Sequence, residues 1–102
     1  MTNIKIGRSF IEIKGHSGYE KIGKDIVCAS ISTLSYSTIN YLKLLGNELK
    51  IIDDNAYLRF ELNKQNNITK NILKGFKEMV KDLEQQFPNY IKVEEIEYEE
   101  VR

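Results

Sequence analysis

The sequence is poor in the residue types that build covalent cross-links and metal sites. Its 102 residues include one cysteine, one histidine and one proline, and they include no tryptophan. A single cysteine excludes an intramolecular disulfide, and one cysteine with one histidine does not make a structural zinc site without carboxylates. We therefore expect no metal in this protein.

The sequence also lacks a net charge and a long hydrophobic run. Fifteen basic and fifteen acidic residues leave a formal charge of zero, which predicts no direct binding of nucleic acid or of an anionic membrane. No apolar run approaches the ~20 residues of a membrane span, and residues 1–5 do not resemble a signal peptide. We expect a cytoplasmic protein. Residues 94–100 are mostly acidic, which indicates an exposed strand edge or a tail.

The remaining composition is typical of a small globular protein. Hydrophobic residues make up 41% and charged residues 29% of the chain, close to ordinary values. The length predicts one domain over residues 1–102. A chain this short buries a modest core, so a dimer interface would add to its stability.

Apolar spacing predicts seven elements. Alternating residues predict strands around 4–6, 11–13, 48–53, 56–62 and 91–93. The last pattern slips before Ile96 and Tyr98, which indicates a bulge or an edge strand. Helical spacing follows Asp25, an N-cap, up to a stop at Gly46, and follows Asn66 or Asn67 up to Pro88. The order ββαββαβ predicts an α+β fold, with one mixed or antiparallel sheet packed against two helices.

Each predicted helix carries one apolar face. The face of the first is expected to hold Val27, Ile31, Leu34, Thr38, Leu42 and Leu45. The face of the second is expected to hold Ile68, Ile72, Phe76, Met79, Leu83 and Phe87.

The segment GHSGYEKIGKDIVC, residues 15–28, contains the only histidine and the only cysteine. With Asp25 as N-cap, Cys28 falls in the first helical turn, where N–H groups lack intrahelical partners and the helix dipole favours a thiolate. A thiolate is a nucleophile, an imidazole is a suitable general base, and the same N–H groups are candidate donors to a substrate oxyanion. Glycines in the loop would let His16 turn back toward the helix.

The residues alone leave a second interpretation open. A lone cysteine among apolar neighbours is usually a small buried hydrophobe, and a lone loop histidine is usually solvated. Asp25 serves equally as a simple cap, and its charge opposes thiolate formation. Ser32, one turn after Cys28, lies on the same helix face but also fits an ordinary polar surface position.

The pattern Gly15-His16, a glycine-containing loop, Asp25-Ile26-Val27-Cys28-Ala29 and Ser32 resembles the signature of the Prp (YsxB-like) ribosomal-processing cysteine proteases. The flanking strands and the long helix match as well, so the resemblance covers nearly the whole chain. It implies a small bacterial homodimer that removes the N-terminal extension of large-subunit ribosomal protein L-twenty-seven after a phenylalanine-containing motif.

The resemblance also implies a role for each residue of the motif. Cys28 would be the nucleophile and His16 the general base, with no cofactor. Asp25, Ser32 and Gly15 would support the site, and the loop from His16 to Lys24 would order over the substrate. Ser17 and Ile31 depart from the usual pattern, which puts substrate fit in doubt more than activity.

A different class of function stays open beside the protease. The same groove would serve a non-catalytic ribosome-assembly factor or a peptide-binding module. A general thiol hydrolase or a redox sensor is a weaker third possibility, because the chain has no second cysteine to resolve an oxidised one.

Overall fold

The computed structural model describes residues 1–21 and 25–96. Five strands and two helices follow one another as β1 (Thr2–Ile6), β2 (Phe10–Lys14), α1 (Ile26–Leu44), β3 (Leu49–Asp54), β4 (Tyr57–Leu62), α2 (Asn67–Gln86) and β5 (Ile91–Glu95). This is the predicted ββαββαβ order of an α+β fold.

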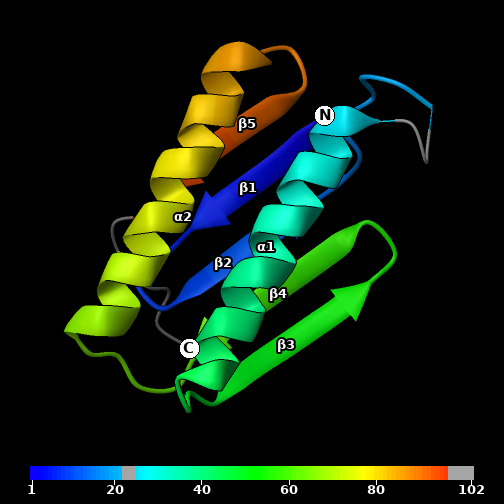
Figure 1. Ribbon diagram of the computed structural model, residues 1–102. Coiled ribbons are helices and arrows are strands. Elements are labelled where there is room, and N and C mark those ends of the chain that lie inside the picture. Colours follow the sequence, from blue (N-terminus) through cyan, green and yellow to red (C-terminus); the bar gives the residue numbers. More distant parts are fainter. Residues whose placement is uncertain (22–24, 97–102) are drawn as a thin grey trace.

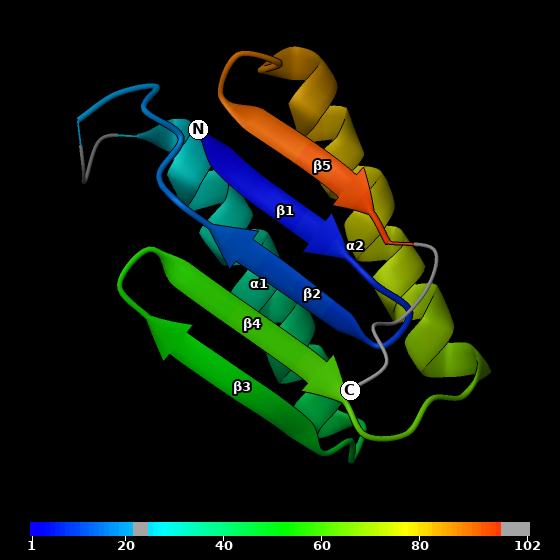
Figure 2. The same cartoon turned by 180° about the vertical axis from the view of Figure 1, so that it is seen from behind.

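The strands form one sheet in the order β3-β4-β2-β1-β5. β5 runs parallel to β1, and the other neighbouring pairs are antiparallel, so the sheet is mixed. Both helices cover the same face of the sheet (Figure 1), and the view from behind shows the other face without a helix (Figure 2). β3 and β5 are the two edge strands. The slip in the apolar pattern before Ile96 and Tyr98 predicted a bulge or an edge strand, and β5 is an edge strand. Tyr98 itself lies outside the described residues.

A row of charged residues crosses the face of the sheet without helices. In register across four adjacent strands lie Arg59, Glu12, Lys5 and Glu94. Opposite charges directly across from each other stabilise a sheet modestly and keep its face solvated. The apolar core therefore lies between the sheet and the helices.

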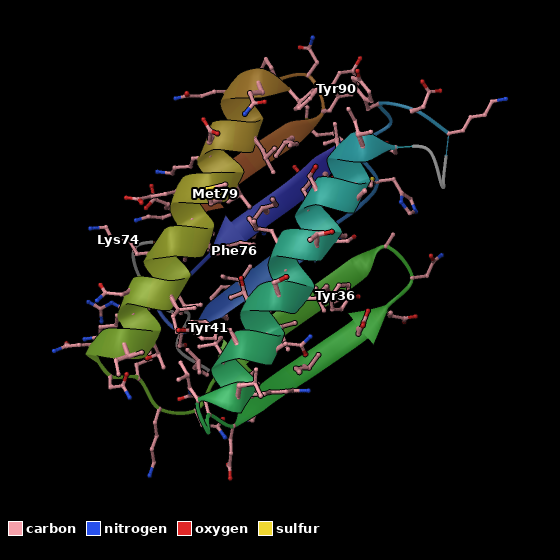
Figure 3. All side chains as sticks on the ribbon, in the orientation of Figure 1. Tyr36, Tyr41, Lys74, Phe76, Met79 and Tyr90 are labelled. Carbon is pink, nitrogen blue, oxygen red and sulfur yellow. The ribbon has the colours of Figure 1, made fainter. Side chains whose placement is uncertain are left out.

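The core combines alternate strand residues with one stripe of each helix. Ile4, Ile11 and Phe60 are almost fully buried, and the ring of Phe60 meets that of Phe76 edge to face at 6.1 Å between centroids. Phe76 projects from α2 in Figure 3. Such rings add packing energy beyond their buried area.

The predicted helix faces are only partly correct. α1 buries Val27, Ile31, Ser35, Ile39 and Leu42, and α2 buries Thr69, Leu73, Phe76 and Val80. Leu45, Ile68 and Met79, which were expected inside, are exposed. Each helix carries apolar residues on more than one stripe, and contact with the sheet selects the stripe that is buried.

The helix ends follow the prediction. Asp25 caps α1, and Asn66 caps α2 in a capping box with Thr69. Gly46 follows α1 with a φ of +86°, which glycine adopts without strain. Among the described residues, neither helix has the length and the apolar character that a membrane-spanning helix requires.

Candidate active site

Most of the predicted site residues meet around one cavity. It has a volume of about 180 Å³ and lies where α1 begins, beside the end of β2 and the β3–β4 hairpin. His16, Cys28, Ser32 and Gly15 all line it. Residues 16 and 28 thus come together although a loop separates them.

Asp25 organises the start of α1. Its Oδ1 accepts hydrogen bonds from the backbone N–H groups of Val27 and Cys28, both at 2.9 Å. Its Oδ2 accepts from the Ser17 hydroxyl and from the N–H of Glu20. The carboxylate is buried, and these donors replace the water it has lost.

The same contacts set the ionisation of Asp25. Burial by itself raises the pKa, but the hydrogen bonds from Ser17 and from the backbone of Cys28, Glu20 and Val27 outweigh it and lower the pKa from 3.8 to about 2. Because the pKa of Asp25 is lower in the folded protein than in the unfolded chain, its carboxylate stabilises the fold fully at pH values above the unfolded pKa. This stabilisation is lost as the pH falls through the folded pKa.

We predict the pH dependence of folding from this residue. Between pH 4 and pH 2 the wild-type protein should lose about 2 kcal/mol more of its unfolding free energy than an Asp25→Asn variant. Asparagine still caps a helix but carries no titrating charge. Urea unfolding at several pH values measures both proteins. If the unfolding free energies of the two proteins changed in parallel with pH, the Asp25 carboxylate would contribute nothing to the pH dependence of stability in that range.

The sulfur of Cys28 is held by Ser17. The backbone N–H of Ser17 donates to Sγ at 3.3 Å, and the thiol donates to the Ser17 hydroxyl oxygen at 3.5 Å. The Ser17 hydroxyl in turn donates to Asp25. Buried Ser17 therefore connects the candidate nucleophile to the helix cap, a role that no sequence signal assigned to it.

The expected oxyanion donors are already occupied. The N–H groups of Val27 and Cys28 point to the Asp25 carboxylate, and that of Ala29 donates to the Asp25 carbonyl at 3.0 Å. Our prediction that these groups are free for a substrate oxyanion is wrong for this arrangement, because the side chain that caps the helix uses the same donors.

His16 is exposed and lines the cavity. Within the described parts of the chain, the hydrogen-bond partners of Sγ are atoms of Ser17 and not the His16 ring. Catalytic hydrogen bonds are often incomplete without substrate. That the loop from His16 to Lys24 orders over substrate stays a prediction, and its residues 22–24 lie outside the described part.

Gly15 places His16 at the end of β2. Its φ is +95°, and a Cβ built on it would lie 2.7 Å from the Met1 carbonyl oxygen. Its N–H donates to the Ala56 carbonyl at 2.8 Å. Both the backbone conformation and the close approach require glycine here.

Two further features of the cavity were not anticipated. The Tyr36 hydroxyl, on α1, donates to Asp53 Oδ2 on β3 at 2.9 Å. This hydrogen bond, with burial and the carboxylate charge, raises the pKa of Tyr36 above 10. Thr2, buried in β1, also lines the cavity. No sequence motif pointed to these residues, because only the packing of α1 on the sheet brings them together.

The reactive groups that the cavity presents are a thiol, an imidazole and several hydroxyls. These are the groups of nucleophilic and acid–base catalysis. The described residues contain no group of three or more histidine, cysteine, aspartate or glutamate side chains arranged for a metal ion.

Comparisons with known proteins identify relatives over nearly the whole chain. The family model described as cysteine protease Prp matches residues 1–92. The ribosomal processing cysteine protease Prp of Mycoplasma genitalium is 30% identical over 105 residues, which cover 97% of this chain and all of the relative.

Solved structures share the fold. The S. aureus protease Prp in complex with a covalently linked product peptide superimposes with a TM-score of 0.88 at 21% identity, over 94% of this chain and all of the other. The same protease in complex with a substrate peptide gives 0.82 at 18% identity, with the same coverage. The match of the family model over most of the sequence shows that this chain belongs to the Prp family of cysteine proteases.

Proposed function

We propose that this protease removes the N-terminal extension of large-subunit ribosomal protein L-twenty-seven, cutting after a phenylalanine-containing motif. The observation that carries the proposal is that Cys28 and His16 line one cavity at the start of α1 in a member of the Prp family. The M. genitalium relative is named a ribosomal processing protease, which supports a ribosomal substrate.

In the proposed mechanism Cys28 is the nucleophile and His16 the general base. His16 takes the thiol proton, and the thiolate attacks the scissile carbonyl to form a C–S bond. As the C–N bond breaks, His16 returns the proton to the leaving amine, and water then hydrolyses the acyl-enzyme to release the acid and the thiol. These steps use only groups of the protein, the peptide and water.

Three residues would support this dyad. Asp25 holds the first turn of α1 and, through Ser17, the position of Sγ. Gly15 sets the direction in which β2 ends at His16. Ser32 lines the cavity one turn beyond Cys28, where its hydroxyl is available to a substrate.

The cavity suits a phenylalanine side chain. Its lining includes the buried residues Ile13, Ile31 and Leu58. A cavity of about 150 Å³ lined by apolar residues is large enough to bind benzene, and this one measures about 180 Å³. The fit supports recognition of an aromatic residue next to the cut.

A peptide that spans the extension and the first residues of the mature ribosomal protein tests the proposal. We expect two products whose masses identify the cut, and a thioester adduct on Cys28 when the reaction is stopped early. A bound but uncut peptide would favour the second candidate, a non-catalytic assembly factor or peptide-binding module. The sulfur of Cys28 is hydrogen-bonded to Ser17 and not to His16. This observation favours the non-catalytic candidate.

We further propose that the protein acts in the bacterial cytoplasm as a homodimer without binding nucleic acid directly. The homodimer is implied by the family resemblance, and the zero net charge supports the absence of nucleic-acid binding. Sedimentation should give twice the 11.9 kDa of one chain. A mass of one chain at micromolar concentration would contradict the dimer.

A further inference from the structure

One aromatic side chain of the loop between β2 and α1 packs on a distant part of the chain. The ring of Tyr19 meets those of Phe87 and Tyr90 edge to face, with centroids 5.4 Å and 5.1 Å apart. Aromatic rings favour this geometry at these separations. Tyr90 lies at the corner between α2 and β5 (Figure 3). Tyr19 therefore attaches the loop to that corner.

The corner is a firm support for the ring of Tyr19. Phe87 caps the C-terminal end of α2 and packs against the hydrophobic core. The N–H of Tyr90 donates to the Phe87 carbonyl at 3.0 Å, and the Tyr90 carbonyl accepts from the N–H of Thr2 on β1 at 2.9 Å. The two supporting rings are thus fixed to a helix end and to an inner strand of the sheet.

The residues on either side of Tyr19 make the polar contacts at the start of α1. The N–H of Tyr19 donates to the Ser17 hydroxyl oxygen at 3.2 Å, and that oxygen also accepts from the Cys28 thiol. The Ser17 N–H donates to Sγ at 3.3 Å, and the Glu20 N–H donates to Asp25 Oδ2 at 3.3 Å. A ring fixed at position 19 therefore restricts the backbone that carries these donors.

We propose that Tyr19 is a positioning residue for the cleavage reaction: its packing on Phe87 and Tyr90 holds Ser17 against the sulfur of Cys28. This inference rests on the proposed function, in which Cys28 is the nucleophile. A reacting group that is held in place before substrate binds loses less freedom in the reaction, and a small displacement of such a group slows the reaction strongly.

Replacement of the ring tests the proposal with the peptide that spans the ribosomal-protein extension. Tyr19→Ala should lower kcat about tenfold and leave KM within about twofold of wild type. Tyr19→Phe keeps the ring and should restore kcat to within about twofold of wild type. The matched control is Tyr41→Ala, which removes another exposed tyrosine ring from the outer side of α1 and should leave kcat within about twofold of wild type.

The supporting ring is tested by a double variant. Tyr90→Ala should lower kcat as Tyr19→Ala does, because each removes one side of the same contact. The double variant should be slower than either single variant by no more than about twofold, since residues that act as a unit are not additive. Losses that multiply would show that the two rings act independently and would overturn the proposal.

Amide hydrogen exchange measures the position of the loop without reference to activity. Exchange of the Ser17 amide, which donates to Sγ, should be about tenfold faster in Tyr19→Ala than in wild type. The Ala29 amide donates to the Asp25 carbonyl inside α1 and should exchange within about twofold of its wild-type rate. Equal acceleration of both amides would indicate a general loss of stability and would contradict a positioning role.

The remaining failures are distinguishable. A wild-type kcat in Tyr19→Ala, a tenfold loss that Tyr19→Phe does not restore, or the same loss in Tyr41→Ala overturns the inference and leaves the protease assignment intact. A raised KM with unchanged kcat would assign Tyr19 to substrate binding and would also overturn it. No cleavage by the wild-type protein overturns the proposed function, and the exchange measurement still reports whether Tyr19 holds Ser17.

Discussion

A Cys28→Ala variant should cleave at least roughly 10⁴-fold more slowly than wild type while remaining folded. In the proposed mechanism the Cys28 thiolate forms the covalent intermediate, and alanine offers no atom to replace it. The substitution removes only two weak hydrogen bonds with Ser17, so the unfolding free energy should change by about 1 kcal/mol or less. Product formation followed by mass spectrometry, together with urea unfolding, measures both quantities.

The control for this experiment lies on the same helix. Ser30 is exposed, and its hydroxyl donates to the Ile26 carbonyl at 2.7 Å. Ser30→Ala should cleave within about twofold of wild type. A Cys28→Ala protein that still produces both fragments at a comparable rate would mean that another group performs the attack, and the dyad would have to be abandoned.

Gly15→Ala should strongly destabilise the fold although it adds only one methyl group. The residue combines a φ of +95° with a Cβ position 2.7 Å from the Met1 carbonyl oxygen. The backbone strain costs about 1–2 kcal/mol, and the forced movement of packed backbone adds about 1–2 kcal/mol more. We expect the unfolding free energy to fall by about 3 kcal/mol, which thermal unfolding would record as a decrease of roughly 12–20 °C in Tm.

Gly46→Ala separates the two causes. Gly46 has a similar φ of +86°, but a Cβ there would meet nothing within 4 Å, so this variant should suffer only the strain, about 1–2 kcal/mol. Equal losses at positions 15 and 46 would show that the clash with Met1 relaxes without penalty. Because Gly15 precedes His16, its substitution should also slow cleavage, whereas that of Gly46 should not.

Local sequence signals predicted the elements but not the way in which they face one another. Capping residues and period-two alternation act over a few residues. The cap at Asp25 was therefore predicted correctly, the second cap was narrowed to Asn66 or Asn67, and the strand Tyr57–Leu62 was predicted to within one residue. The buried stripe of a helix depends on what it packs against. For that reason Ile39 and Val80 are buried where Leu45 and Met79 were expected.

The sequence by itself determined the element order, the cap at Asp25, and the placement of Cys28 in the first turn of the helix that the cap begins. Each of these depends on neighbours within a few positions. It also determined, through the motif from Gly15 to Ser32, the family resemblance that the comparisons confirmed.

Only the tertiary structure decided what surrounds the thiol. Ser17 takes the sulfur of Cys28 as a hydrogen-bond partner. β3 brings Asp53 and Asp54 to the cavity, and β1 brings the buried hydroxyl of Thr2. These contacts join residues far apart in the chain, and no local propensity encodes them, because they arise from the packing of α1 against the strands of the sheet.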